Sequence, residues 1–260
     1  MPEGDTIFRT ARTLHQALAG RTVTSFLSVF PALTRVDHDR PLRGRVIDSV
    51  RPHGKHLLMS FSGGLVLRTH MRMHGAWHIY RPGERWMRPR REMRIVIATK
   101  EFEAVAFDVP VAEFMTPRDV ERRPTLKDLG PDIMADGFEI DEAVARIQAR
   151  ADVEIADALL DQQAIAGIGN IFKSESLFAA RVNPFVRVRE VPAAQVAKIV
   201  TAARNLMRSE PRPALRVYMR GGRLCRRCGT TITRRAQGPN ARSTYWCETC
   251  QPTAGPEGPP

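Results

Sequence analysis

The chain has 260 residues, 43% of them hydrophobic, which excludes wholesale disorder and allows one large domain or two to three smaller ones. Its formal net charge of +12 favours a polyanionic partner, either nucleic acid or an anionic membrane surface. No apolar run approaches the roughly 18–20 residues that span a bilayer, and Asp5 interrupts any signal-peptide core. We therefore expect an intracellular protein whose four cysteines are thiolates or metal ligands.

The sequence predicts one helix near the start of the chain, followed from roughly Thr22 to Phe107 by short strands. Apolar residues on one face predict a helix over about Glu3 to Ala19, with Gly20 at a left-handed cap. Several short strands at close spacing then favour a sandwich or barrel over a parallel sheet. The helical face is Ile7, Ala11, Leu14 and Leu18; the strand runs are Val46-Ile47, Leu57–Met59, Leu65–Leu67, Ile95–Ile97 and Val105–Phe107, with a hairpin at Ser62-Gly63-Gly64.

Beyond Leu129-Gly130-Pro131-Asp132 the pattern becomes helical, with segments at 140–148, 155–162, 172–180 and 194–207. Asn170 follows Gly167-Ile168-Gly169 and is predicted to cap the third of these helices. Two interpretations stay open for this turn. It is either an ordinary N-cap, or a helix N-terminus whose N–H groups and Asn amide bind a phosphate.

All four cysteines lie in two Cys-x-x-Cys pairs separated by eighteen residues. This spacing matches a four-thiolate zinc site that closes a ribbon of two hairpins. Four thiolates leave no open coordination position, so we expect one structural Zn²⁺ ion. Neither pair follows a strand of a thioredoxin-like unit, which disfavours redox dithiols. The pairs are Cys225/Cys228 and Cys247/Cys250, and the arginines in or beside them, which suit phosphates, are Arg223, Arg226, Arg227, Arg234, Arg235 and Arg242.

The chain begins Met1-Pro2-Glu3. If Met1 is removed, Pro2 offers a secondary amine, and a free α-amine has a reference pKa of about 7.7–8.0. Such an amine is substantially neutral and nucleophilic near pH 7. Its addition to a carbon such as a sugar C1′ would give an iminium ion, which is an electron sink. Taken alone, the tripeptide favours a chance Met-Pro start.

Two further segments leave alternatives open. Lys55 in His53-Gly54-Lys55-His56 is either a solvated loop residue or a cation held at a strand entry. The run His70–Gly75 is either half-buried packing, since Met fills cores, or a loop that inserts into a base stack.

Taken together, these segments resemble the formamidopyrimidine-DNA glycosylase and endonuclease VIII family. The resemblance runs in order from residue 2 to about 251. It is carried by Pro2-Glu3-Gly4-Asp5, Gly54-Lys55, Leu129-Gly130-Pro131-Asp132, Gly167-Ile168-Gly169-Asn170 and Arg242-Ser243-Thr244-Tyr245-Trp246-Cys247.

The resemblance implies an α+β multidomain fold. An N-terminal β-sandwich with an N-terminal helix would occupy residues 1–125, and a helix-two-turn-helix domain residues 126–220. A zinc-ribbon finger would occupy residues 221–251. The Pro- and Gly-rich residues 252–260 are expected to form a disordered tail.

The resemblance also implies an enzyme of base excision repair. Pro2 would attack C1′ of the damaged nucleotide, and Glu3 would donate the proton that assists sugar ring opening. Lys55 and Asn170 match phosphate-contacting positions, Lys55 also supporting the chemistry. Arg242 matches the finger arginine that binds phosphate and assists the second of two eliminations, β then δ, that cut the strand.

Two differences from the family's sequence patterns indicate which branch of the family this chain resembles. The guanine-lesion branch starts Pro-Glu-Leu-Pro and carries an Arg-Phe pair in a sandwich loop, whereas here Gly4-Asp5 follows Glu3 and the loop reads Asp108–Ala112. The chain thus looks closer to endonuclease VIII, whose substrates are mainly oxidised pyrimidines. The DNA-wedge positions read Arg72, Met73 and His74, and Met73 keeps an apolar wedge.

We therefore expect a monomeric, cytoplasmic, nucleoid-associated DNA glycosylase/AP lyase that binds damaged DNA and no membrane. One alternative is a glycosylase of the same family acting on oxidised purines. Another is a non-catalytic zinc-ribbon protein that binds abasic or structured DNA. A membrane-surface role is disfavoured, because the basic residues gather at the cysteine pairs and not along an amphipathic helix.

Overall fold

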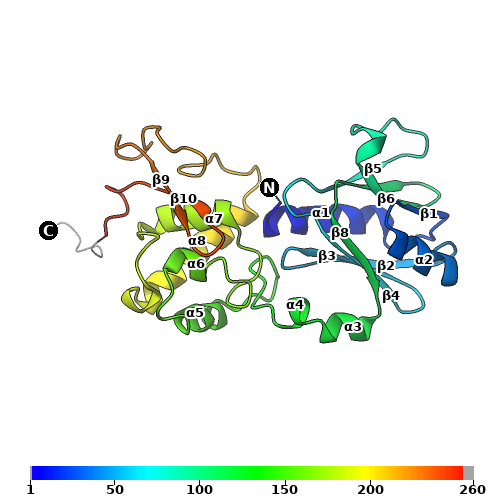
Figure 1. The fold of residues 1–260 in the computed structure, drawn as a ribbon, viewed down its shortest axis with the longest axis horizontal. Helices are drawn as coiled ribbons and strands as arrows, with labels where there is room; N and C mark the ends of the chain where they lie inside the picture. The colour runs from blue at the N-terminus through cyan, green and yellow to red at the C-terminus, as the bar shows by residue number, and fades with distance from the viewer. Residues whose placement is uncertain (1, 254–260) are drawn as a thin grey trace. The chain divides into compact units, whose positions relative to one another are not determined.

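The computed structural model describes residues 2–253, and the chain divides between Asp128 and Leu129 into two compact units (Figure 1). Among the described residues, no helix is both long and apolar enough to cross a membrane. The predicted tail lies, from residue 254 on, outside the described residues, as does Met1.

The first unit is a sandwich of two four-stranded antiparallel sheets, with strand orders β1-β6-β7-β5 and β2-β3-β4-β8. Apolar side chains from both sheets meet in one core. Val96 and Val105, on the other face of the first sheet, are buried in a second cluster with Tyr80 and Phe107. The strands are β1 (Ser25–Ser28), β2 (Ile47–His53), β3 (His56–Phe61), β4 (Leu65–His70), β5 (Ala76–Tyr80), β6 (Met93–Ala98), β7 (Glu103–Phe107) and β8 (Val111–Met115); the helices are α1 (Gly4–Leu18), α2 (Pro31–Asp39), η1 (Arg90–Glu92), α3 (Pro117–Arg122) and α4 (Pro124–Lys127).

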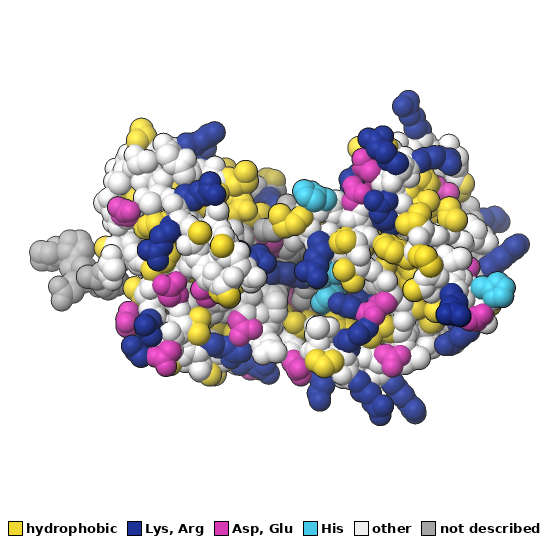
Figure 2. Space-filling model, viewed as in Figure 1, with side chains coloured by type: hydrophobic (Ala, Val, Ile, Leu, Met, Phe, Trp, Pro, Cys, Tyr) yellow, Lys and Arg dark blue, Asp and Glu magenta, His cyan; other side chains and the backbone are white. Residues whose placement is uncertain are grey.

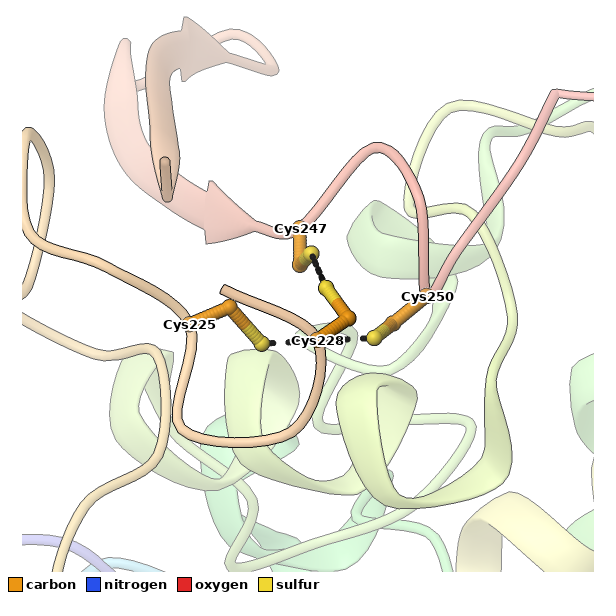
Figure 3. A group of neighbouring side chains, drawn as sticks. All are labelled: Cys225, Cys228, Cys247 and Cys250. Atoms are coloured by element: carbon orange, nitrogen blue, oxygen red, sulfur yellow. Dashed lines mark hydrogen bonds between the residues drawn. The ribbon is translucent and has the colours of Figure 1, made fainter. Parts of the chain in front are cut away.

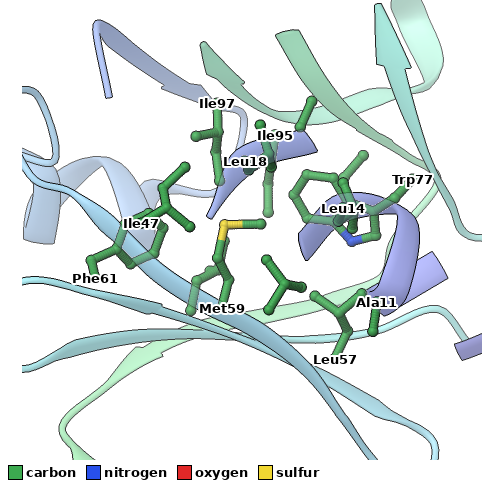
Figure 4. Close-up of a cluster of buried hydrophobic side chains, with 14 of the residues drawn as sticks. Ala11, Leu14, Leu18, Ile47, Leu57, Met59, Phe61, Trp77, Ile95 and Ile97 are labelled. Carbon is green, nitrogen blue, oxygen red and sulfur yellow. The ribbon is translucent and has the colours of Figure 1, made fainter. Parts of the chain in front are cut away.

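Helix α1 contributes to the same core as both sheets. Figure 4 shows Leu14 and Leu18 of α1 among side chains such as Met59 from one sheet and Ile95 from the other. The apolar face predicted for this helix is buried throughout, and Gly20 has the expected left-handed φ of +77°. Because α1 is held by this core, the residues that precede it are held at one defined position.

The expectation of strands alone between residues 22 and 107 is wrong at α2. Pro31 occupies the first turn of this helix, where its missing N–H costs nothing, and only Leu33 is buried. The sequence pattern also did not predict strands β1, β5 and β8. All three are edge strands with half-buried patterns, so they carry a weak apolar signal.

The second unit is helical and ends in a two-stranded hairpin. The helix expected over 155–162 ends at Ala158, because the Asp161 carboxylate accepts the N–H of Gln163 (2.9 Å) and stabilises a turn in place of further helix. Its elements are α5 (Ile140–Gln148), α6 (Ile155–Ala158), α7 (Asn170–Ala180), η2 (Val188–Glu190), α8 (Ala193–Arg208), β9 (Thr233–Gln237) and β10 (Arg242–Trp246).

The predicted α+β fold class is confirmed: an N-terminal β-sandwich with a helix is followed by a helical region and a four-cysteine finger. The boundaries at residues 125 and 220 remain predictions.

Candidate active site and metal centre

Pro2 and Glu3 lie immediately before α1. Pro2 is half-buried, and Glu3 is 1% exposed. The Glu3 carbonyl accepts the N–H of Ile7 (3.0 Å), so Glu3 is the residue from which the helix starts. The positive end of a helix favours a carboxylate at this position. The start of α1 therefore places Pro2 next to a buried acid.

Lys55 occupies the turn between β2 and β3. Gly54 and Lys55 form a two-residue hairpin loop closed by the pairing of His53 with His56. Gly54 has a φ of +58°, which glycine adopts without strain. The turn thus sets Lys55 at the entry of β3, with its side chain half-buried.

Two histidines on neighbouring strands were not given a role by sequence reasoning. The rings of His56 and His70 meet edge to face, with their centroids 4.7 Å apart. Burial first, and then the charge of Arg68, lower the pKa of His56 to about 3. Burial first, and then the charges of Arg72, Arg68 and Lys55, lower the pKa of His70 to about 4. Both rings are therefore neutral near pH 7.

Arg72, Met73 and His74 form a turn between β4 and β5, here called the wedge turn. All three residues are exposed, and Met73 keeps 56% of its surface accessible. The neutral His70 anchors the turn, because its Nδ1 accepts the N–H of Arg72 (3.0 Å). The turn therefore presents an apolar side chain to solvent between two polar ones.

In the second unit, the predicted cap at Asn170 is wrong in detail. Gly169 is the N-cap and Asn170 is the first helical residue of α7. The Asn170 Nδ2 instead donates a hydrogen bond to the Ser243 carbonyl (2.8 Å). Its Oδ1 is buried and has no hydrogen-bond partner within residues 2–253. The side chain serves the hairpin because β10 lies against α7.

Arg242 begins β10 and is exposed. Its strand register places it opposite Gln237, after a turn in which Ala241 has a φ of +47°. Since Ser243 accepts the Asn170 amide, the structure brings two predicted phosphate contacts to neighbouring positions.

A buried polar chain, missed by sequence reasoning, secures this hairpin. Lys173 of α7 is 0% exposed and its Nζ donates to the Thr244 Oγ1 (2.7 Å). The Thr244 hydroxyl donates to Gln237 Oε1 (2.6 Å), and Gln237 Nε2 donates to Glu154 Oε2 (2.6 Å). Buried polar groups need such partners, so this chain fixes the hairpin on α7.

The four cysteines form one cluster (Figure 3). Their Sγ atoms all lie within 4.8 Å of one another, with Cys228 and Cys247 3.4 Å apart and Cys225 and Cys250 3.9 Å apart. A tetrahedron of Zn–S bonds of about 2.3 Å gives S···S separations of about 3.8 Å. The donor set therefore fits one structural zinc ion, as predicted.

The surroundings of the thiols differ. Hydrogen bonds with Thr230 lower the pKa of the Cys228 thiol to about 6, whereas burial raises the pKa of Cys250 to about 12. Burial also raises the pKa of Cys247. Zinc binding would therefore displace protons from this set, and its apparent affinity would increase with pH.

The surface of the molecule carries many basic side chains (Figure 2). Not all finger arginines are available to a ligand, because two stack on aromatic rings of the second unit. Arg227 covers Phe178 and Arg235 covers Phe185, each 4.1 Å from the ring centroid. These two side chains anchor the finger, whereas Arg242 is exposed.

Three family models match consecutive parts of the chain. The formamidopyrimidine-DNA glycosylase N-terminal domain matches residues 1–112, and the H2TH domain of that glycosylase matches residues 129–212. A zinc finger found in FPG and IleRS matches residues 222–253. The three matches follow the sandwich, the helical region and the cysteine finger in order.

Whole-length relatives agree. The chain is 39% identical over 270 residues to a probable endonuclease 8 2 of Streptomyces coelicolor, covering 98% of this chain and 95% of that protein. It is 35% identical to the DNA-(apurinic or apyrimidinic site) lyase Nei2 of Mycolicibacterium smegmatis, covering 96% and 99%. A structure of the Lactococcus lactis Fpg with abasic-site DNA, at 20% identity, shares the fold with a TM-score of 0.82 over 97% of this chain and 100% of that one. The chain therefore belongs to the formamidopyrimidine-DNA glycosylase/endonuclease VIII family.

Proposed function

We propose that this protein is a bifunctional DNA glycosylase and AP lyase of base excision repair that excises oxidised pyrimidines. Family membership and the endonuclease 8 and AP lyase names of its relatives support the activity. The observation that carries the proposal is Pro2 set directly before the buried Glu3 at the start of α1. Removal of Met1 would give Pro2 the free amine that the chemistry requires.

In the proposed reaction, the Pro2 nitrogen attacks C1′, and the bond between C1′ and the base breaks as the base leaves with a proton. Glu3 supplies the proton that opens the sugar ring. The resulting iminium ion withdraws electrons from C2′, so loss of a C2′ proton expels the 3′ phosphate. A further elimination expels the 5′ phosphate, and hydrolysis then frees Pro2.

The remaining predicted residues would act on the phosphates. Lys55, Asn170 and Arg242 would hold the backbone while the base leaves the stack, and Met73 would fill the vacated space between its neighbours Arg72 and His74. The zinc ion would hold the finger and take no part in proton or electron transfer. We further propose that the protein acts as a monomer, which sedimentation with and without DNA would test.

Borohydride trapping tests the chemistry. Reduction of the iminium should give one covalent adduct with duplex DNA that contains an abasic site or 5-hydroxycytosine. A chain with one extra residue before Pro2, in which the Pro2 nitrogen is an amide, should give no such adduct and should still bind abasic DNA. An adduct of undiminished yield from that extended chain would exclude the Pro2 nitrogen as the nucleophile, and the intact mass of the wild-type chain should show loss of Met1.

Parallel cleavage of thymine-glycol and 8-oxoguanine duplexes tests the substrate class. Faster cleavage of the thymine-glycol duplex is expected, because the chain lacks the Arg-Phe pair of the guanine-lesion branch at Asp108–Ala112. Faster cleavage of 8-oxoguanine would instead support the oxidised-purine alternative.

A further inference from the structure

Three segments of the sandwich unit meet at the side chain of Arg88, in the long loop between β5 and β6. Its Nη1 donates to the His74 carbonyl of the wedge turn (3.3 Å). Its Nη2 donates to Asp108 Oδ2 (2.6 Å), and its Nε donates to Glu92 Oε2 (2.7 Å). The guanidinium also lies 5.6 Å from the centroid of the Phe107 ring. One side chain thus ties the wedge turn to two other segments.

Asp108 is the second member of this arrangement. It follows β7 and has a left-handed φ of +47°, an uncommon backbone for a residue with a side chain. Its other carboxylate oxygen accepts from Arg94 Nη2 (3.1 Å), and its N–H donates to the Glu92 carbonyl (2.8 Å). Two guanidinium groups therefore hold the turn that lacks the Arg-Phe pair, and Arg88 connects that turn to His74.

The other end of the wedge turn is held by its own backbone. The N–H of Gly75 donates to the Met71 carbonyl (2.9 Å), and Met71 is 1% exposed. A Cβ at Gly75 would lie 2.6 Å from that carbonyl oxygen, so the turn admits no larger residue there. The exposed Met73 stands between this anchored backbone and the Arg88 contact at His74.

We propose that Arg88 is a positioning residue that holds the wedge turn in the conformation from which Met73 enters the base stack. The proposal rests on the proposed function, since it needs Met73 to act as the wedge. Insertion must offset the cost of unstacking a base step, and a turn that is already ordered pays less entropy on binding. The charge of Arg88 is neutralised by Asp108 and Glu92 on a side chain only 25% exposed, which suits a structural role better than phosphate binding.

The test separates capture of a lesion in duplex DNA from the chemistry. Single-turnover cleavage is measured on a thymine-glycol duplex and on a single strand with an abasic site, where no base pair has to open. Arg88→Ala should slow duplex cleavage about tenfold or more and change single-strand cleavage less than twofold. Arg88→Lys should recover part of the loss, because an ammonium can still bond one of the three hydrogen-bond partners. Arg85→Ala is the matched control, since Arg85 is exposed in the same loop and makes no ion pair with a described residue.

A double-mutant cycle provides the sharper readout. If Arg88 acts through Met73, Arg88→Ala should have little further effect in a Met73→Ala background. Equal slowing in both backgrounds, equal slowing on both substrates, or no slowing at all would each overturn the proposal. Should Arg88→Ala fail to fold, Asp108→Asn replaces it and should give the same pattern. Absence of cleavage by the wild-type chain on both substrates would instead reject the proposed function.

Discussion

The Asn170 side chain at the start of α7 donates a 2.8 Å hydrogen bond to the carbonyl of Ser243, 73 residues later in the finger hairpin. This contact explains why a residue predicted to cap a helix does not cap it. It also couples the helical turn at Gly167-Ile168-Gly169 to the strand that starts with Arg242. A single amide thus aligns two candidate phosphate-binding elements of the second unit.

Replacing Asn170 by Ala should weaken binding to abasic duplex DNA about tenfold, because a hydrogen bond to a charged group contributes about 1.5–3 kcal/mol. The salt dependence of binding should not change, since a neutral amide displaces no counterion. Fluorescence anisotropy at several salt concentrations measures both. The matched control is Asn183→Ala, because Asn183 donates to the Gln251 carbonyl (3.0 Å) and also anchors the finger. Equal loss of affinity in both variants would show that Asn170 only holds the finger in place and does not contact the phosphate.

Replacing Arg242 by Gln should change both the salt dependence and the products. The slope of log affinity against log salt should fall by about 0.9, the value for one lost phosphate contact. Strand cleavage should then accumulate the β-elimination product at the expense of the δ-elimination product on denaturing gels. Lys198→Gln removes the same charge from an exposed position on α8 and should alter neither. An unchanged product ratio in Arg242→Gln would remove Arg242 from the second elimination.

Removal of zinc should unfold the finger and leave the sandwich intact. Trp246 is 7% exposed and packs edge to face on Phe185, with centroids 4.7 Å apart, directly before Cys247. Chelation should therefore shift tryptophan emission to the red and weaken DNA binding, and zinc should restore both. Plasma mass spectrometry should give one zinc ion per chain. The Cys247→Ser variant should bind less zinc than the wild-type chain. The Trp246→Phe variant is the control: if chelation no longer shifts its tryptophan emission, the shift in the wild-type chain comes from Trp246 in the finger.

Stability should decrease as pH falls below about 6.5. The pKa values of His56 and His70 are lowered to about 3 and about 4 in the folded protein, mainly by burial. The unfolded chain, with histidine pKa values near 6.5, then binds more protons, so acid favours unfolding. Each of these two histidines lowers the free energy of unfolding by at most about 1.4 kcal/mol for each pH unit that the pH falls between about 6.5 and its folded pKa.

Urea unfolding from pH 7.5 to pH 4.5 measures this dependence. His56→Gln should make it shallower, since Gln can still accept the Nε–H that Arg68 donates to His56 (3.2 Å). His38→Gln is the control, because the His38 side chain is 88% exposed. Identical slopes for wild type and His56→Gln would show that His56 does not carry the effect.

Local sequence alone determined the elements whose stabilising partners lie within the same segment. The apolar face of α1, the left-handed Gly20 and the hairpin at Ser62-Gly63-Gly64 follow from side-chain periodicity and backbone freedom. The zinc cluster follows from cysteine spacing, because a tetrahedral thiolate site accepts few loop lengths. Edge strands such as β1 and β5, and the surface helix α2, were not predicted from the sequence, because they bury little apolar surface.

Tertiary structure decided the contacts between residues far apart in the chain. The Asn170 amide donates a hydrogen bond to the Ser243 carbonyl, and the buried Lys173 donates one to Thr244. Arg88 donates hydrogen bonds to both His74 and Asp108. None of these pairs has a spacing that a local pattern reveals, since each depends on which strand or loop packs beside it. The physical reason is that a buried or half-buried polar group takes whatever partner the fold brings within hydrogen-bond reach.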